Sequence, residues 1–201
     1  ILRGVAGDGD AAEEIASLLD DADSAIRRKA AELLFDLNRP STTTALRLAL
    51  TRDEDPIVRA WCALALTRAG QGAPLVFDLL NGRDVRLARL AALALADAGD
   101  GKGVEQLIAW WRDEPARNYQ QSRWLLAAFA RLHAKSAVPA LVRSLGDVRL
   151  RPHIAAALAE IGDSSAREPL ARAFADERYQ NARVAIAQAL VQLHAREEMA
   201  R

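Results

Sequence analysis

Two series of residues recur along the chain with the same period, and this internal repeat constrains the fold more than any other feature. In the first series, a large apolar residue is followed four positions later by another, at Ile15/Leu19, Leu46/Leu50, Leu75/Leu79, Leu107/Trp111, Leu141/Leu145 and Leu170/Phe174. The second series consists of the residues at which the second segment of each copy ends, here called end marks. They are Asn38, Gly70, Gly99, His133, Gly162 and His194. Both series advance by 29 to 34 residues, so the chain is built from about six copies of one unit.

The apolar residues before each end mark indicate that the unit is helical. They stand four and eight positions before the mark, as Leu66 and Cys62 do before Gly70. These spacings describe one face of an α-helix, and no run alternates with the period of two that predicts a strand. The fifth position is small in five of six units, for example Ala65, which lets neighbouring helices approach. Each unit is therefore predicted to be a helical hairpin of about 31 residues.

The ends of the expected helices carry suitable residues. Acidic side chains precede several second helices, as in residues 53–55, where carboxylates can cap free N–H groups. Gly70, Gly99 and Gly162 stand where a left-handed residue ends a helix.

Composition excludes several classes of protein. The 201 residues hold 27 basic and 27 acidic side chains, so the strong basic excess typical of proteins held by nucleic-acid phosphates or anionic lipid is missing. A single cysteine cannot form an internal disulfide or a thiolate zinc site. The uncharged apolar runs are far shorter than the roughly 20 residues of a membrane span. These features predict a cytoplasmic protein without a membrane segment.

The repeats are predicted to form one domain over residues 1–201. Their boundaries fall at about 8–38, 39–70, 71–99, 100–133, 134–162 and 163–194. Leu2, Val5 and Gly7 match the last turns of a second helix, so residues 1–7 are interpreted as the end of a preceding repeat. We expect a fragment of a longer solenoid, whose apolar end faces would allow copies to associate end to end.

Two stretches carry a family resemblance, residues 53–59 with 63–66 and residues 137–141 after His133. They resemble HEAT repeats, specifically the short HEAT-like type also found in the phycobilisome lyase family. The resemblance covers nearly the whole chain. It implies an all-α fold, an α-solenoid that forms a right-handed superhelix of about six hairpins.

The resemblance also implies a ladder of turn acids and second-helix arginines between repeats. Its positions match at Asp21/Arg27, Asp53/Arg59 and, with Glu for Asp, Glu177/Arg183. Repeat five has Arg151 with Asp147. In repeats three and four the arginine position holds Ala88 and Ser122, so an interruption is expected there.

The chain offers few residues for catalysis or metal binding. His133 and His194 occupy helix ends, where an imidazole interacts favourably with the helix dipole, and Cys62 falls in the core series. The sequence has no closely spaced histidine pair, phosphate loop or nucleophile elbow. We predict no catalytic residue, no metal and no cofactor, and therefore no enzymatic activity in these residues. Whether a flanking domain carries an activity is a separate question that these 201 residues do not address.

An apolar band is predicted on the concave face, which second helices commonly line. The ninth, sixth and second residues before each end mark share one side of the helix. This stripe is polar in repeats one, five and six and apolar in the middle three. The candidate partner-binding residues are Trp61, Leu64, Leu90, Leu93 and Trp124, edged by Arg68, Arg89, Arg123 and Arg131. Exposed aromatic and Arg side chains are typical of a binding hot spot, and burial between adjacent second helices is the alternative.

A lengthened turn in repeat four adds two candidates. The interval from Leu107 to Ser122 is 15 residues, against 13 from Leu46 to Arg59. The extra length includes Tyr119, and Trp110 precedes it. Aromatic residues on such a loop could project a contact, and variable filler is the alternative.

The leading interpretation is a non-enzymatic scaffold that binds another protein or a peptide segment, such as an amphipathic helix, on its concave face. The resemblance to bilin lyase subunits gives an alternative, attachment of a tetrapyrrole to a phycobiliprotein. A second alternative is similarity to HEAT-like DNA glycosylases, whose concave side is basic and aromatic. The zero net charge and the lack of an identifiable catalytic Asp do not favour nucleic acid as the partner.

Overall fold

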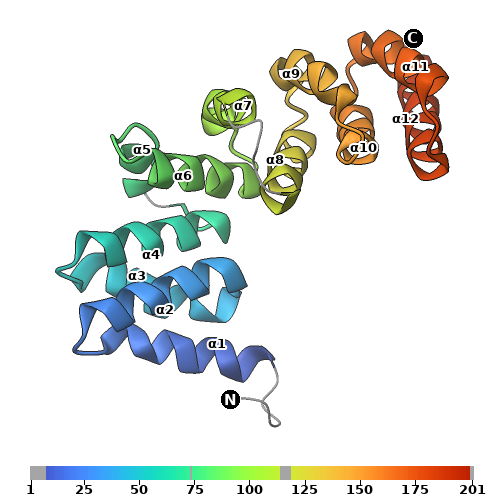
Figure 1. Cartoon of the computed structure of the whole chain (residues 1–201). Coiled ribbons are helices and arrows are strands. Elements are labelled where there is room, and N and C mark those ends of the chain that lie inside the picture. Colours follow the sequence, from blue (N-terminus) through green and yellow to red (C-terminus); the bar gives the residue numbers. More distant parts are fainter. Residues whose placement is uncertain (1–7, 73, 114–118, 200–201) are drawn as a thin grey trace. The chain divides into compact units, whose positions relative to one another are not determined.

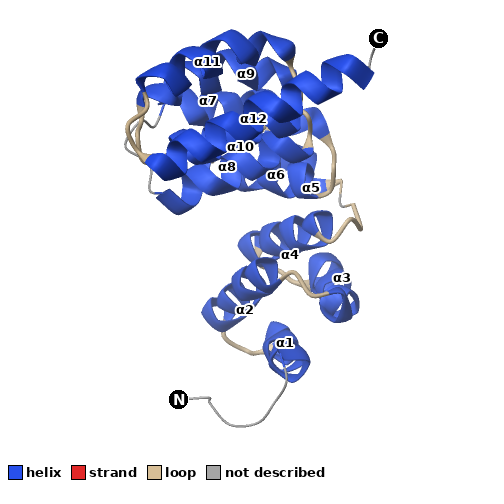
Figure 2. Cartoon of the chain, turned by 90° about the vertical axis from the view of Figure 1, so that its right-hand side faces the viewer, coloured by secondary structure: helices blue, strands red, loops and turns tan. Residues whose placement is uncertain are grey.

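The computed structural model describes residues 8–72, 74–113 and 119–199. This part of the chain contains twelve α-helices and six short 3₁₀ helices, and no strand. The predicted all-α hairpin fold is confirmed (Figure 2). The predicted end of a preceding repeat, with Leu2, Val5 and Gly7, lies outside the described residues.

The chain divides into two compact units, Ile1–Ala98 and Gly99–Arg201, within one residue of the boundary predicted between repeats three and four (Figure 1). Unit one contains α1 (Asp8–Ser17), η1 (Leu18–Asp20), α2 (Ser24–Leu37), η2 (Pro40–Thr42), α3 (Thr43–Arg52), α4 (Pro56–Arg68), α5 (Leu75–Leu80) and α6 (Val85–Asp97). The single domain over residues 1–201 stays a prediction.

Unit two has the same alternation of first and second helices. It contains η3 (Gly101–Gly103), α7 (Val104–Asp113), α8 (Tyr119–Arg131), η4 (Lys135–Ala137), α9 (Val138–Arg143), η5 (Ser144–Gly146), α10 (Arg151–Ile161), η6 (Ser164–Ala166), α11 (Arg167–Asp176) and α12 (Gln180–Met199). Three hairpins therefore make up each unit.

Second helices pack side by side within each unit. Helix α4 packs between α2 and α6, and α10 packs between α8 and α12. The first helices α3 and α11 each pack on the second helix of their own hairpin. In Figure 2, α8, α10 and α12 lie side by side in one layer. This layer has one face on the first helices and another face that can carry a binding site.

The predicted core register is confirmed. The buried residues at the fourth and eighth positions before the end marks are Leu34, Leu66, Leu95, Phe129 and Leu158, with Ala30, Cys62, Ala91, Leu125, Ile154 and Ile186. Burial raises the pKa of the Cys62 thiol to about 12. Leu190 of the last repeat is the exception and is half-buried. Ile26, twelve positions before Asn38, is 40% exposed, since α2 packs on α4 on one side and the described residues place no second helix on the other.

Five of the six predicted end marks adopt the left-handed conformation. They are Asn38, Gly70, Gly99, His133 and Gly162, with φ between +45° and +80°. The prediction for His194 is wrong, because α12 continues to Met199. The residues after His194 favour helix, and Arg196 Nη1 donates to the Glu160 carbonyl at 2.9 Å, which stabilises the added turn.

Ion pairs between turns join successive hairpins. Arg27 of repeat one makes two parallel hydrogen bonds to the Asp53 carboxylate of repeat two, Nε to Oδ2 at 2.7 Å and Nη2 to Oδ1 at 3.0 Å. Arg151 of repeat five pairs with Glu177 of repeat six through one hydrogen bond, from Nη1 to Oε2, while its Nε donates to the Leu145 carbonyl. Repeat three carries Gly82 where Asp21 and Asp53 stand in repeats one and two, so its turn offers no carboxylate at that position.

These pairs keep the turn carboxylates charged. The hydrogen bond from Arg27 lowers the pKa of Asp53 against the opposing effect of burial. The backbone N–H of Tyr179, aided by Arg151, lowers the pKa of Glu177. A depressed carboxyl pKa stabilises the fold above the unfolded-state pKa, and the gain is lost as the pH falls through the folded-state value.

Asp53→Asn should lower the free energy of unfolding at pH 7 by about 2 kcal/mol, because a buried charged hydrogen bond is lost. The difference from the wild type should shrink below about pH 4, where the wild-type carboxylate takes up a proton. Urea unfolding followed by circular dichroism measures both effects. Glu168→Gln, which removes an exposed pair with Arg172, is the matched control. A difference that grows in acid would contradict the account.

Candidate functional site

The predicted partner-binding residues fall in both units, so each half is described by itself. Unit one holds Trp61, Leu64, Arg68, Arg89, Leu90 and Leu93, and unit two holds Trp110, Tyr119, Arg123, Trp124 and Arg131.

In unit one, much of the predicted apolar band is interior. Leu64 and Leu93 are buried, which corrects their assignment as surface contacts. In these two repeats the sixth position before the end mark serves packing, whereas Ala127 and Ala156 at the same position of repeats four and five are exposed. Arg89 and Leu90 are half-buried.

Trp61 and Arg68 are tied into the packing of unit one. The Trp61 ring lies 5.6 Å from the Phe35 ring, centroid to centroid. The Arg68 guanidinium lies over Phe35 at 5.0 Å, donates to the Phe35 carbonyl at 2.9 Å and pairs with Asp97 at 2.7 Å. Arg68 thus connects α2, α4 and α6 and has a structural task.

In unit two, Trp110 is buried, which corrects its assignment as a contact residue. It shares the buried side of α7 with Leu107, Ile108 and Trp111, and this apolar face is wider than the repeat pattern suggested. The sequence analysis placed Tyr119 in the lengthened turn. In the structure it is the first residue of α8.

The remaining candidates of unit two are exposed. Trp124 is 47% and Tyr119 is 48% exposed, and Arg123 and Arg131 are exposed as well. The Arg123 guanidinium lies 6.0 Å from the centre of the Tyr119 ring. These side chains come from α8, whose other side is packed in the core.

A groove of about 220 Å³ runs between α8 and α10 beside these residues. Its lining consists of Arg123, Leu126, Ala127, Ala130, His153, Ala156, Ala157 and Glu160. Alanines keep it open, because longer side chains would fill the space. Arg123 and His153 lie near the beginnings of their helices and Glu160 lies near the end of α10, so the groove carries opposite charges toward its two ends.

His153 and Tyr119 close one end of the groove. The Tyr119 hydroxyl and His153 Nε2 form a hydrogen bond of 2.5 Å, and the two rings meet edge to face at 5.5 Å. Burial and the nearby Arg123 charge lower the pKa of His153, so the imidazole is neutral at pH 7.

Sequence reasoning placed the repeat-five stripe, His153, Ala156 and Glu160, outside the candidate band because it is polar. The structure brings all three into the groove. The sequence did hold the signal that these residues belong with the candidate band. They stand nine, six and two positions before Gly162, and Trp124 likewise stands nine positions before His133. Polarity was the wrong reason to separate them.

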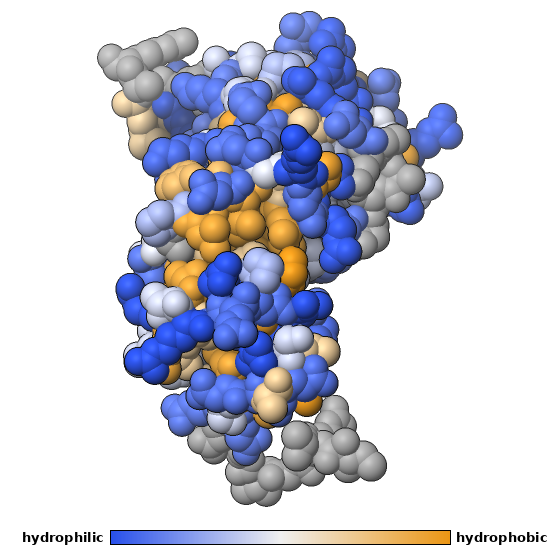
Figure 3. All heavy atoms as spheres, turned by 90° about the vertical axis from the view of Figure 1, so that its left-hand side faces the viewer, coloured by the Kyte–Doolittle hydropathy of each residue, from blue (hydrophilic) through white to orange (hydrophobic). Residues whose placement is uncertain are grey.

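Apolar residues also reach the surface outside the predicted stripe. Figure 3 shows one face of the molecule, on which hydrophobic side chains gather in a patch bordered by hydrophilic ones. Ile57 and Val85 are examples of exposed apolar residues in unit one. Exposure alone therefore does not mark a site. We give most weight to Trp124, because it is exposed and follows Arg123, which lines the groove.

Residues 8–72, 74–113 and 119–199 contain no cluster of three or more His, Cys, Asp and Glu side chains arranged to hold a metal ion. None of the helices in these ranges has both the length and the apolarity needed to cross a membrane.

Comparison with known families agrees with the repeat pattern. The family model for HEAT repeats matches residues 2–67. The resemblance predicted from the sequence is thereby confirmed for this segment. No curated protein sequence matches the chain.

Solved structures with a similar fold cover most of the chain. An engineered protein superposes with a TM-score of 0.54 at 20% identity, over 92% of this chain and 97% of that one. The complex of CpcE and CpcF of phycocyanin lyase from Nostoc sp. PCC7120 gives 0.49 at 18% identity, covering 96% and 97%. Human deoxyhypusine hydroxylase gives 0.47 at 19% identity, covering 93% and 75%. At these identities the likeness concerns the fold alone.

Trp61→Ala and Trp124→Ala should have different effects on stability. Trp61→Ala should cost about 2–3 kcal/mol of unfolding free energy, because its ring packs on Phe35. Trp124→Ala should cost less than about 1 kcal/mol, because much of its ring faces solvent. Urea denaturation of the two variants tests this. Equal losses would show that Trp124 serves packing.

Proposed function

We propose that this chain is a non-enzymatic scaffold that binds a protein segment in the groove between α8 and α10, with Trp124 as the anchor. The observation that carries the proposal is an indole, 47% exposed, on the same helix as the groove residues and next in sequence to Arg123, which lines the groove. Large aromatic side chains at the centre of an interface contribute much of its binding energy.

The groove suits an amphipathic segment. Its alanine floor allows the backbone of a ligand helix to approach, and Leu126 offers apolar contact. Arg123 at one end favours an acidic residue of the ligand. Glu160 at the other end already receives hydrogen bonds from Gln192 and Arg196, so it contributes less to charge selection.

A role without catalysis is supported by the chemistry of the side chains. Cys62 is fully buried and its pKa is raised to about 12, so it is a poor nucleophile at pH 7. His153 is neutral and bonded to a tyrosine, which suits shape recognition. The ligand we propose is a protein segment, and cytoplasmic localisation remains part of the proposal.

Association between copies is a separate prediction. Helix α12 exposes Val184, Val191 and Met199. Apolar side chains on a terminal helix would support end-to-end contact.

A display library of helical peptides selected against the immobilised protein tests the groove. Selected peptides should bind Trp124→Ala about 30-fold more weakly than wild type, because a central aromatic hot spot contributes about 2 kcal/mol. Tyr179→Ala removes an exposed aromatic that lies between α11 and α12, on neither of the two helices that line the groove, and should leave binding unchanged. Peptides that bind wild type and Trp124→Ala equally would overturn the proposal.

A further inference from the structure

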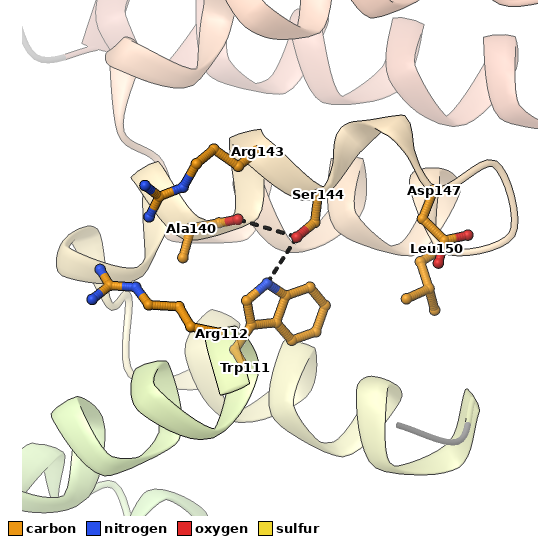
Figure 4. A pocket seen from close by; sticks show the side chains of 7 residues that line it. All are labelled: Trp111, Arg112, Ala140, Arg143, Ser144, Asp147 and Leu150. Carbon is orange, nitrogen blue, oxygen red and sulfur yellow. Dashed lines mark hydrogen bonds between the residues drawn. The ribbon is translucent and has the colours of Figure 1, made fainter. Parts of the chain in front are cut away.

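A pocket of the same kind lies between successive first helices at two places in the chain. The unit-one pocket, of about 350 Å³, belongs to repeats one and two, and its lining includes Leu19, Asp20, Leu48, Ala49 and Arg52. The unit-two pocket, of about 590 Å³, belongs to repeats four and five, and its lining includes Trp111, Arg112, Arg143, Ser144 and Asp147 (Figure 4).

The two pockets occupy equivalent places in their repeats. Counted from the paired apolar residues that open each repeat, these five lining residues of the unit-two pocket correspond in order to the five of the unit-one pocket. The stacking of adjacent hairpins therefore leaves the space in both places, and the side chains around it decide what it can bind.

The charges of the two pockets are opposite in sign. The unit-one pocket is lined by four carboxylates and two guanidinium groups, those of Asp20, Asp21, Asp53 and Glu54 with Arg27 and Arg52. The unit-two pocket is lined by the guanidinium groups of Arg112 and Arg143 and the carboxylate of Asp147. Arg112 stands where the first pocket has Asp20, and Asp147 stands where it has Arg52. The unit-two pocket is therefore suited to an anion.

The two arginines of this pocket have no partner of their own. Both are exposed, and within the described residues neither guanidinium takes part in an ion pair or a hydrogen bond. In Figure 4 they extend toward one end of the pocket, away from Asp147 and Leu150. Like charges at one end of a pocket repel each other, and a bound anion offsets that repulsion.

The repeat pattern does not require these arginines. No other repeat has an arginine at the position of Arg112, and the other arginine at the position of Arg143 is Arg172 of repeat six. Arg172 pairs with Glu168 of its own helix at 3.1 Å. Arg112 and Arg143 are therefore no part of the ladder that joins the repeats.

The wall between the two ends of the pocket is fixed by hydrogen bonds. Trp111 Nε1 donates to Ser144 Oγ at 3.0 Å, and Ser144 Oγ donates to the Ala140 carbonyl at 3.2 Å. Asp147 accepts the backbone N–H of Arg149, and the Nε of Arg149 lies 3.7 Å from its carboxylate. Asp147 thus has a cation nearby, whereas the arginine end lacks an anion.

We propose that the unit-two pocket binds an acidic side chain, Asp or Glu, of a partner protein segment, whose carboxylate pairs with Arg112 and Arg143. The occupant follows from charge complementarity, because guanidinium groups pair strongly with carboxylates. Ala140, Leu150 and the indole of Trp111 give apolar surface for the methylene groups of such a residue, which an inorganic anion would not use. The pocket shares no lining residue with the groove between α8 and α10, so this proposal does not rest on that groove.

Titration with N-acetylglutamate methylamide tests the site. The indole N–H signal of Trp111 should shift and saturate in nuclear magnetic resonance spectra at low ionic strength, where exposed charges are least screened. The glutamine analogue has the same shape without the charge and should bind at least about fivefold more weakly. Trp124→Ala should bind the glutamate probe as the wild type does, which separates this site from the groove.

Arg112→Gln and Arg143→Gln should each weaken binding of the glutamate probe at least about threefold, because each removes one of the two guanidinium groups. Arg172→Gln is the matched control, since it removes the arginine at the same position of repeat six, and it should leave binding unchanged. Both substituted lining residues are exposed, so the variants should fold, which circular dichroism checks. The comparison of the two probes on the wild type decides the question in any case.

The absence of a saturable shift, equal binding of the glutamate and glutamine probes, or undiminished binding by both arginine variants would overturn the proposal. Tighter binding of N-acetylarginine methylamide than of the glutamate probe would assign the pocket to cations through Asp147 and would overturn it as well. Saturable binding of inorganic phosphate without binding of the glutamate probe would assign it to phosphate groups, with the same consequence.

Discussion

The pairing of a turn carboxylate with a guanidinium from the preceding hairpin sets how one repeat sits on the next. A single hairpin cannot bury its apolar face alone, so it depends on its neighbours. Apolar packing is tolerant of small rotations, whereas the two parallel hydrogen bonds between Arg27 and Asp53 allow one register. Packing thus provides most of the stability, and the ion pair fixes the orientation of one repeat on the next.

The proposed binding groove lies between repeats four and five, on the layer of second helices. Its lining includes alanines at 127, 130, 156 and 157, which leave room that longer side chains would fill. A scaffold can acquire a site in this way without any change of fold.

Periodicity predicted the fold well and the site only in part. The register of Leu66 and Phe129 identified the core, and the end marks at Asn38 and His133 coincide with left-handed backbone. The same register could not tell how wide the apolar face of a helix is. Leu64 and Trp110 were therefore placed on the surface although they are buried.

Contacts between repeats were harder to foresee. The bond between Tyr119 and His153 joins residues 34 positions apart, and it depends on where α8 begins after a turn of unusual length.

Hydrogen exchange at arginine side chains measures the ladder directly. The Nε–H group of Arg27 should exchange with water at least about tenfold more slowly than those of Arg112 and Arg149, because it donates a part-buried hydrogen bond to the Asp53 carboxylate of the next repeat. Equal exchange at the three side chains would show that this pair does not lock the two repeats together, and it would contradict the account.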